Sequence, residues 1–127
     1  EAHEAIGTMP NLFGMKIAES VYKHGHFWLR DLLTYLEKNV KLFDNAISKI
    51  DGLKSIPLSA TYLAWIDFSN TGLPEKDIVQ KVHKTAGIAA SIGSTFGRGG
   101  ERFMRFNLAC PTTKVSEAAS RLQRAFN

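Results

Sequence analysis

The sequence predicts an α+β fold in which helices cover a small three-stranded sheet. Three observations support this class: a long helical stripe of apolar residues, three later runs with strand-like character, and a closing amphipathic segment. Two helices precede the first strand, and one of them is long. With 127 residues and 44% hydrophobic content, the chain is long enough for one domain with a core.

The two helices before the sheet differ in length. The first is expected to begin near Pro10 and Asn11 and to end or kink at Gly25. The second has apolar residues at steps of three and four, which mark one face of a long helix that Asp51 and Gly52 stop. That stripe consists of Leu29, Leu33, Leu36, Val40, Phe43, Ile47 and Ile50. Three heptads are few for a coiled coil, so we expect the stripe to pack on the protein's own sheet.

The first strand is expected over residues 58–68. Its apolar residues alternate with polar ones, and Leu63 and Trp65 make its second face partly apolar. A strand that is apolar on both faces is typical of a central position in a sheet. The other two strands are expected over residues 88–92 and 103–110.

Two further helices are expected around these later strands. One begins at Pro74 with an acidic first turn, packs an apolar side inward, and ends at Gly87. The other follows Pro111, with Thr112 or Thr113 as its cap. Their apolar positions are Ile78, Val79, Val82 and Ala86 in the first, and Val115, Ala118, Ala119, Leu122 and Phe126 in the second.

Arg105 is the unexpected residue of the last strand. Alternation places Met104 and Phe106 on one face, and Phe103, Arg105 and Asn107 on the other. An unpaired buried guanidinium would be very costly, so Arg105 either reaches solvent or meets an anion. The pattern alone leaves both alternatives open. In the second, the guanidinium binds a carboxylate or phosphate through two parallel hydrogen bonds.

The loop before this strand is rich in glycine and arginine. Gly93, Gly97, Gly99 and Gly100 allow sharp bends and close backbone approach. The loop matches neither of the common phosphate-binding fingerprints. Together with Phe103 and Phe106, its Arg and Gly residues are similar to an RNA-recognition strand, where exposed aromatic rings stack on bases. An RNA-binding module is therefore the alternative function, although such a module also needs a strand after its final helix.

Composition limits the remaining classes. A net charge of +4 and a pI near 9.3 are too mildly basic to predict a nucleic-acid partner. The single cysteine, Cys110, excludes an internal disulfide and fits a reducing, cytoplasmic compartment. No apolar run approaches the roughly 18 residues of a membrane span, and no signal peptide is visible. The histidines lack the companion spacing of a metal site, and Cys110 has no local signature of a nucleophile.

Three motifs occur in order along the chain: Tyr-Leu-Ala-Trp-Ile-Asp-Phe at 62–68, Gly-Ser-Thr-Phe-Gly at 93–97, and Phe-Met-Arg-Phe-Asn-Leu-Ala-Cys-Pro at 103–111. Together they resemble the C-terminal small domain of the class I and II aminotransferases, fold type I of the pyridoxal-phosphate enzymes. The resemblance is greatest to the cystathionine β-lyase branch. Residues 11–25 resemble the helix that leads from the large domain of such enzymes into the small one.

The resemblance implies a role for Arg105. In that family the strand arginine binds the α-carboxylate of the amino-acid substrate, and the loop at 93–97 lies at the mouth of the active site. The family often has proline where this chain has Ile92, which changes the expected stiffness of the loop. The reaction implied is transamination or β-elimination at a carbon–sulfur bond, and both remain open.

The resemblance also implies parts that this sequence lacks. Pyridoxal phosphate is bound by the large domain, through a lysine upstream of this region, and no lysine here has that context. We therefore expect no catalytic residue in this chain, and no activity from the chain alone. Residues 1–25 are expected to be a lead-in and helix that contact the large domain, and residues 26–127 the small domain. The chain starts at Glu1 rather than methionine, as a piece of a longer protein would. A homodimer is expected, with no nucleic-acid or membrane partner.

Overall fold

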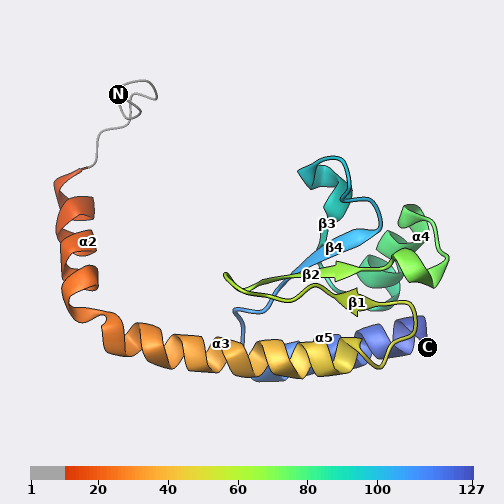
Figure 1. The fold of residues 1–127 in the computed structure, drawn as a ribbon, viewed down its shortest axis with the longest axis horizontal. Helices are drawn as coiled ribbons and strands as arrows, with labels where there is room; N and C mark the ends of the chain where they lie inside the picture. The colour runs from red at the N-terminus through yellow and green to blue at the C-terminus, as the bar shows by residue number, and fades with distance from the viewer. Residues whose placement is uncertain (1–10) are drawn as a thin grey trace. The chain divides into compact units, whose positions relative to one another are not determined.

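The computed structural model describes residues 11–127 (Figure 1). The predicted lead-in, including Pro10, lies outside the described residues. The described residues divide into two compact units, residues 11–34 and residues 35–127. No helix in the described range is long and apolar enough to cross a membrane.

The described part of the first unit consists of helix α2, Leu12–His24, and the beginning of helix α3, His26–Ile47. The expected start of α2 is confirmed, because the Asn11 side chain accepts a hydrogen bond of 2.7 Å from the Gly14 N–H. Gly25 ends α2, as expected. A Cβ atom at this glycine would lie 2.6 Å from the Val21 carbonyl oxygen, so a larger residue would not fit there. No residue of α2 is buried.

Helix α3 continues into the second unit, where its apolar stripe enters the core. Its buried residues are Leu36, Asn39, Phe43 and Ile47. The helix ends at Ile47, and the buried Ile50 follows it in a turn that reaches Gly52. Gly52 has a φ of +82°, a left-handed conformation that favours glycine. The predicted packing of the stripe is therefore confirmed from Leu36 onward.

Among residues 11–127, the sheet has four strands rather than the predicted three. They are β1 (Lys54–Ser55), β2 (Leu63–Asp67), β3 (Ser91–Ile92) and β4 (Phe103–Asn107), in the order β1-β2-β4-β3. Each neighbouring pair is antiparallel. The α+β class is confirmed, and the predicted number of strands is wrong by one. The sequence could not reveal β1, because two residues are too few to show alternation.

The first expected strand is shorter than the pattern suggested. It was expected from residue 58, but β2 begins at Leu63. Thr61 has a φ of +66°, which interrupts extended backbone before that point. Its central position is confirmed, since β2 lies between β1 and β4.

The helix between β2 and β3 has two parts. Helix α4, Glu75–Gln80, continues into a π-helical segment, Lys81–Thr85, and Gly87 follows with a φ of +64°. Because β4 pairs between β2 and β3, this helix and its two strands form a split β-α-β unit.

The last helix, α5, spans Thr112–Phe126 and differs from the prediction at its first residue. Neither threonine caps it, because Pro111 occupies the cap position and Thr112 instead donates to the Asn39 side chain over 2.7 Å. The Thr112 N–H donates to the Tyr35 hydroxyl over 2.8 Å, which satisfies one free donor of the helix terminus. Hydrogen bonding to the side chain and backbone of Thr112 lowers the pKa of Tyr35 below its ordinary value.

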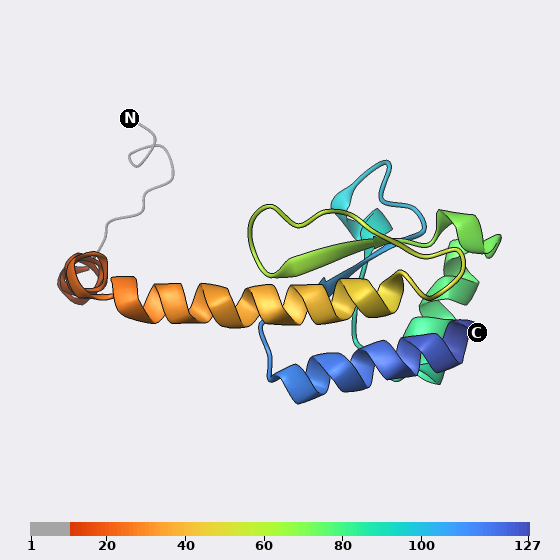
Figure 2. The ribbon, with the colours of Figure 1, turned by 60° about the horizontal axis from the view of Figure 1, so that its bottom comes forward.

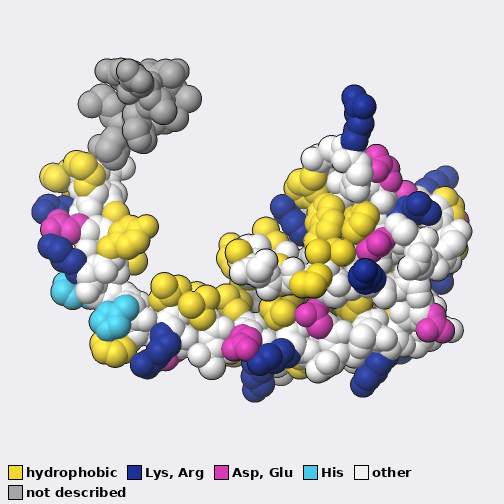
Figure 3. All heavy atoms as spheres, in the orientation of Figure 1, with side chains coloured by type: hydrophobic (Ala, Val, Ile, Leu, Met, Phe, Trp, Pro, Cys, Tyr) yellow, Lys and Arg dark blue, Asp and Glu magenta, His cyan; other side chains and the backbone are white. Residues whose placement is uncertain are grey.

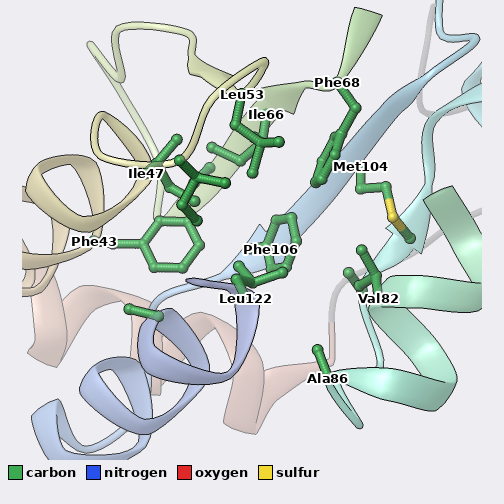
Figure 4. Close-up of a cluster of buried hydrophobic side chains, with 14 of the residues drawn as sticks. Phe43, Ile47, Leu53, Ile66, Phe68, Val82, Ala86, Met104, Phe106 and Leu122 are labelled. Atoms are coloured by element: carbon green, nitrogen blue, oxygen red, sulfur yellow. The ribbon is translucent and has the colours of Figure 1, made fainter. Parts of the chain in front are cut away.

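The core lies between the helices and one face of the sheet. Helices α3 and α5 lie side by side against that face (Figures 1 and 2). Figure 4 shows how Phe43 from α3, Phe106 from β4 and Leu122 from α5 point toward one another. The rings of Phe43 and Phe106 are 5.4 Å apart. The opposite face of the sheet carries the predicted site residue.

Candidate functional site

Arg105 lies at the centre of β4, on the face of the sheet away from the core. Its neighbours Met104 and Phe106 are buried, whereas Arg105 is half-buried. It pairs across the sheet with Trp65 of β2 and Ser91 of β3. The alternation predicted for this strand is therefore confirmed, and it presents the guanidinium on the open face.

One aromatic ring, that of Phe96, contacts Arg105, and the rings of Trp65 and Phe103 extend this contact as a chain of neighbouring rings; we call the four residues the Arg105 cluster: Trp65, Phe96, Phe103 and Arg105. The guanidinium carbon of Arg105 lies 4.3 Å from the centroid of the Phe96 ring. The Trp65 ring meets the Phe96 ring edge-on at 5.7 Å and stacks on the Phe103 ring at 5.6 Å. Figure 3 shows hydrophobic side chains gathered on this side of the sheet.

A turn after β3 supplies the Phe96 ring. Residues Gly93–Phe96 form one 3-10 turn, in which the Thr95 hydroxyl donates to the Ile92 carbonyl over 2.5 Å. Gly93 and Gly100 lie against each other at the base of the loop. A Cβ atom on Gly93 would lie 2.3 Å from the Gly100 oxygen, and one on Gly100 would lie 2.2 Å from the Gly93 oxygen. The expected close backbone approach in this loop is confirmed.

The guanidinium of Arg105 has no charged partner among residues 11–127. The ion pairs found in this range all join other side chains. In the same range, no buried side-chain nitrogen or oxygen lacks a hydrogen-bond partner. The nitrogens of Arg105 therefore reach solvent, and an anion that enters there would meet free N–H donors. The geometry is compatible with both alternatives that the sequence left open.

The structure contradicts the RNA-binding alternative. An RNA-recognition strand requires Phe103 and Phe106 together on an exposed face, but the two residues lie on opposite faces of β4, and Phe106 is only 4% exposed. Within residues 11–127 no strand follows α5, and β1 occupies the sheet edge beside β2.

The remaining candidate groups do not form a site in the described range. No group of His, Cys, Asp and Glu within residues 11–127 could hold a metal ion. Cys110 is half-buried, and its backbone carbonyl accepts a hydrogen bond of 2.9 Å from the Asn39 side chain. His83 is hydrogen-bonded to the Ala90 carbonyl over 2.8 Å.

The residues of the Arg105 cluster do not fit pyridoxal phosphate by themselves. That cofactor needs a lysine for covalent attachment and a partner for its ring nitrogen. The cluster holds one arginine and three aromatic rings, with neither a lysine nor a carboxylate. Lys81, on the π-helical segment, donates to the Ala125 carbonyl over 2.8 Å and is engaged in the fold.

Sequence reasoning missed two contributors to the arrangement. Phe96 belongs to one of the three motifs, but its contact with Arg105 depends on a turn whose path the sequence does not give. Trp65 was interpreted as an apolar residue of a central strand. Its place beside Arg105 follows from the register of β2 with β4, which becomes clear only once the sheet is known.

Several known proteins are similar to this chain, although no protein-family model matches it. Cystathionine β-lyase PatB of Bacillus subtilis is 32% identical over 92% of the chain and 30% of its own length. LL-diaminopimelate aminotransferase of Aquifex aeolicus is 33% identical over 75% of the chain and 23% of its own length. Cystalysin from Treponema denticola, whose crystal structure contains pyridoxal 5′-phosphate, has a TM-score of 0.86 and 30% identity. That similarity covers 97% of this chain and 32% of cystalysin.

The fold and the similarities together define the class. The chain is similar over most of its length to pyridoxal-phosphate-dependent aminotransferases and carbon–sulfur lyases, which confirms the resemblance seen in its motifs. Its relatives include the cystathionine β-lyases, the branch that the motifs indicated. The chain spans about 30% of the length of PatB.

Proposed function

We propose that this chain is the small domain of a pyridoxal-phosphate-dependent enzyme acting on an amino acid, an aminotransferase or a carbon–sulfur β-lyase. Arg105 binds the α-carboxylate of the substrate. The observation that supports this most is a guanidinium without a charged partner among residues 11–127, on the open face of a central strand and next to an exposed turn. A planar guanidinium suits a carboxylate because it can donate two parallel hydrogen bonds to it.

In this proposal Arg105 contributes binding and orientation rather than bond breaking. By fixing one end of the amino acid, it limits how the remaining bonds of the α-carbon are presented to the reacting group. The centroid of the Phe96 ring lies 4.3 Å from the guanidinium carbon, and this ring limits how the Arg105 side chain can turn. Pyridoxal phosphate, held by the large domain, supplies the electron sink for the chemistry.

The rest of the enzyme lies outside this chain in the proposal. Residues 1–25 contact the large domain, residues 26–127 form the small domain, and the 127 residues alone are inactive. The exposed apolar side chains of α2 are the surface for that contact; they are Leu12, Phe13, Met15, Ile17, Val21 and Tyr22. The enzyme is a cytoplasmic homodimer with no nucleic-acid or membrane partner.

The role of Arg105 is tested by Arg105→Ala in the full-length enzyme. We expect KM for the amino acid to rise and kcat/KM to fall by about 10- to 150-fold, the range for a lost hydrogen bond to a charged group. Arg124→Ala is the matched control, because Arg124 is an exposed arginine on α5. Unchanged kinetics in Arg105→Ala would remove Arg105 from the site.

The assignment to this enzyme class is tested by the coding sequence upstream of Glu1. We expect it to encode a large domain that contains the lysine for covalent attachment of the cofactor. A reading frame without such a lysine would overturn the proposed activity.

A further inference from the structure

We propose that Phe96 is a positioning residue that fixes the orientation of Arg105 and so sets how tightly the site holds a carboxylate. This inference rests on the proposed function of Arg105 and adds a specific partner to it. Phe96 comes from a turn, whereas Arg105 comes from a strand, so the contact joins the loop to the sheet.

The contact uses the flat face of the guanidinium and leaves its edge free. Stacking on an aromatic ring is attractive for a cation, and it consumes none of the five N–H donors, which lie in the guanidinium plane. Arg121 on α5 is the contrasting case, because one of its guanidinium nitrogens donates to the Glu117 carboxylate. Arg105 is thus restrained in orientation while its donors stay available for a ligand.

Two independent supports hold the Phe96 ring in place. From the side, the Trp65 ring meets it at an interplanar angle of 70°, and Trp65 is itself stacked on Phe103. At the base of the loop, the close approach of Gly93 to Gly100 fixes the turn that carries Phe96. The Ser94 hydroxyl also donates to the Glu75 carboxylate over 2.5 Å, which ties the turn to the start of α4.

The exposure of Phe96 argues for a role beyond core packing. Its side chain is 52% exposed, so burial of apolar surface does not account for its position. At this exposure Phe96 remains accessible to a molecule that approaches from solution. Movement of this turn would therefore change the orientation of Arg105, and this links loop position to carboxylate binding.

The test compares Phe96→Leu with Phe96→Tyr in the full-length enzyme. Leucine keeps apolar bulk but removes the aromatic face, so we expect KM for the amino acid to rise about three- to tenfold with kcat little changed. Tyrosine keeps the aromatic face, so we expect KM of Phe96→Tyr to equal that of wild type. Tyr62→Leu is the matched control, because Tyr62 is an exposed aromatic residue with no ring contact to Arg105.

A second readout does not depend on substrate. In NMR spectra of the 127-residue chain, the ring of Phe96 should displace the Nε–Hε resonance of Arg105. We expect this displacement to be lost in Phe96→Leu and kept in Phe96→Tyr. If Phe96→Leu leaves both KM and this resonance unchanged while Arg105→Ala raises KM, the inference is overturned and the proposed function stands. If Arg105→Ala also leaves KM unchanged, both are overturned.

Discussion

The two ends of helix α3 carry the same apolar stripe but have opposite environments. Leu29 and Leu33, in the first unit, are 49% and 56% exposed, whereas Phe43 and Ile47, in the second unit, are 1% and 0% exposed. Spacing and residue type do not distinguish these positions. A periodic stripe thus predicts a helix face that needs a partner, but it does not say whether this chain supplies that partner.

The largest effect we predict separates the two ends of the stripe. Phe43→Ala should destabilise the folded protein by about 3–5 kcal/mol, since it leaves a cavity beside Phe106. Leu33→Ala, its counterpart at the exposed end, should change the free energy of unfolding by less than about 0.5 kcal/mol. Urea unfolding of both variants at low protein concentration measures this difference. Equal losses of unfolding free energy in the two variants would contradict the difference between the buried and the exposed end of α3.

The second prediction concerns the one polar residue buried on this helix in the described range. Asn39 is fully buried and donates to the carbonyls of Leu108 and Cys110 over 3.0 and 2.9 Å. Asn39→Ala leaves both carbonyls without this partner, so we expect a loss of about 2–3 kcal/mol in urea unfolding. Asn45→Ala, at an exposed position, is the control and should stay within about 0.5 kcal/mol of wild type. A loss of unfolding free energy as small as that of the control would show that the Asn39 hydrogen bonds do not stabilise the segment after β4.

The third prediction concerns helix α2, in the first unit. The apolar side chains of α2 lack cover among the described residues, so we expect the 127-residue chain to self-associate or to rearrange α2. Ile17→Glu should weaken association by about tenfold or more, because it removes apolar area worth at least about 1.4 kcal/mol. Ser20→Glu places the same charge at an exposed polar position and serves as control. Sedimentation across a range of concentrations measures the mass, and a strict monomer with unchanged α2 at every concentration would contradict the prediction.

The smallest effect is expected on the solvent side of α3. Lys41 donates to Glu37 over 2.6 Å, and this hydrogen bond lowers the pKa of the Glu37 carboxyl. A lowered pKa in the folded state means that the stabilisation is present above the unfolded pKa and disappears as pH falls through the folded one. Glu37→Gln should therefore reduce stability slightly at neutral pH and not at all at acidic pH, as urea midpoints at the two pH values would show. A difference that grows toward acidic pH would contradict this account.

Much of the fold could be predicted because its elements carry strong local patterns. The starts of α2, α4 and α5 follow from Asn11, Pro74 and Pro111, and the alternation of β4 places Arg105 on the correct face. The predictions that were wrong concerned an element too short to show a pattern and a contact with a residue distant in the sequence. Strand β1 has only two residues, and Thr112 bonds to Asn39 rather than capping its own helix because α3 lies within reach.

The candidate site shows the same division. The position of Arg105 in mid-strand was sufficient to single it out, since an arginine there needs either solvent or an anion. Its aromatic neighbours come from β2 and from the turn after β3, and only the sheet register and the path of that turn bring them together. Local sequence therefore predicts the charged group, and tertiary structure determines its orientation.

The most direct measurement compares an amino acid with the corresponding amine that lacks the α-carboxylate, using the full-length enzyme. We expect wild type to prefer the amino acid in kcat/KM by about 10- to 150-fold, and Arg105→Ala to lose this preference while its activity toward the amine is unchanged. An Arg105→Ala variant that discriminates between the two compounds as well as wild type would contradict this expectation.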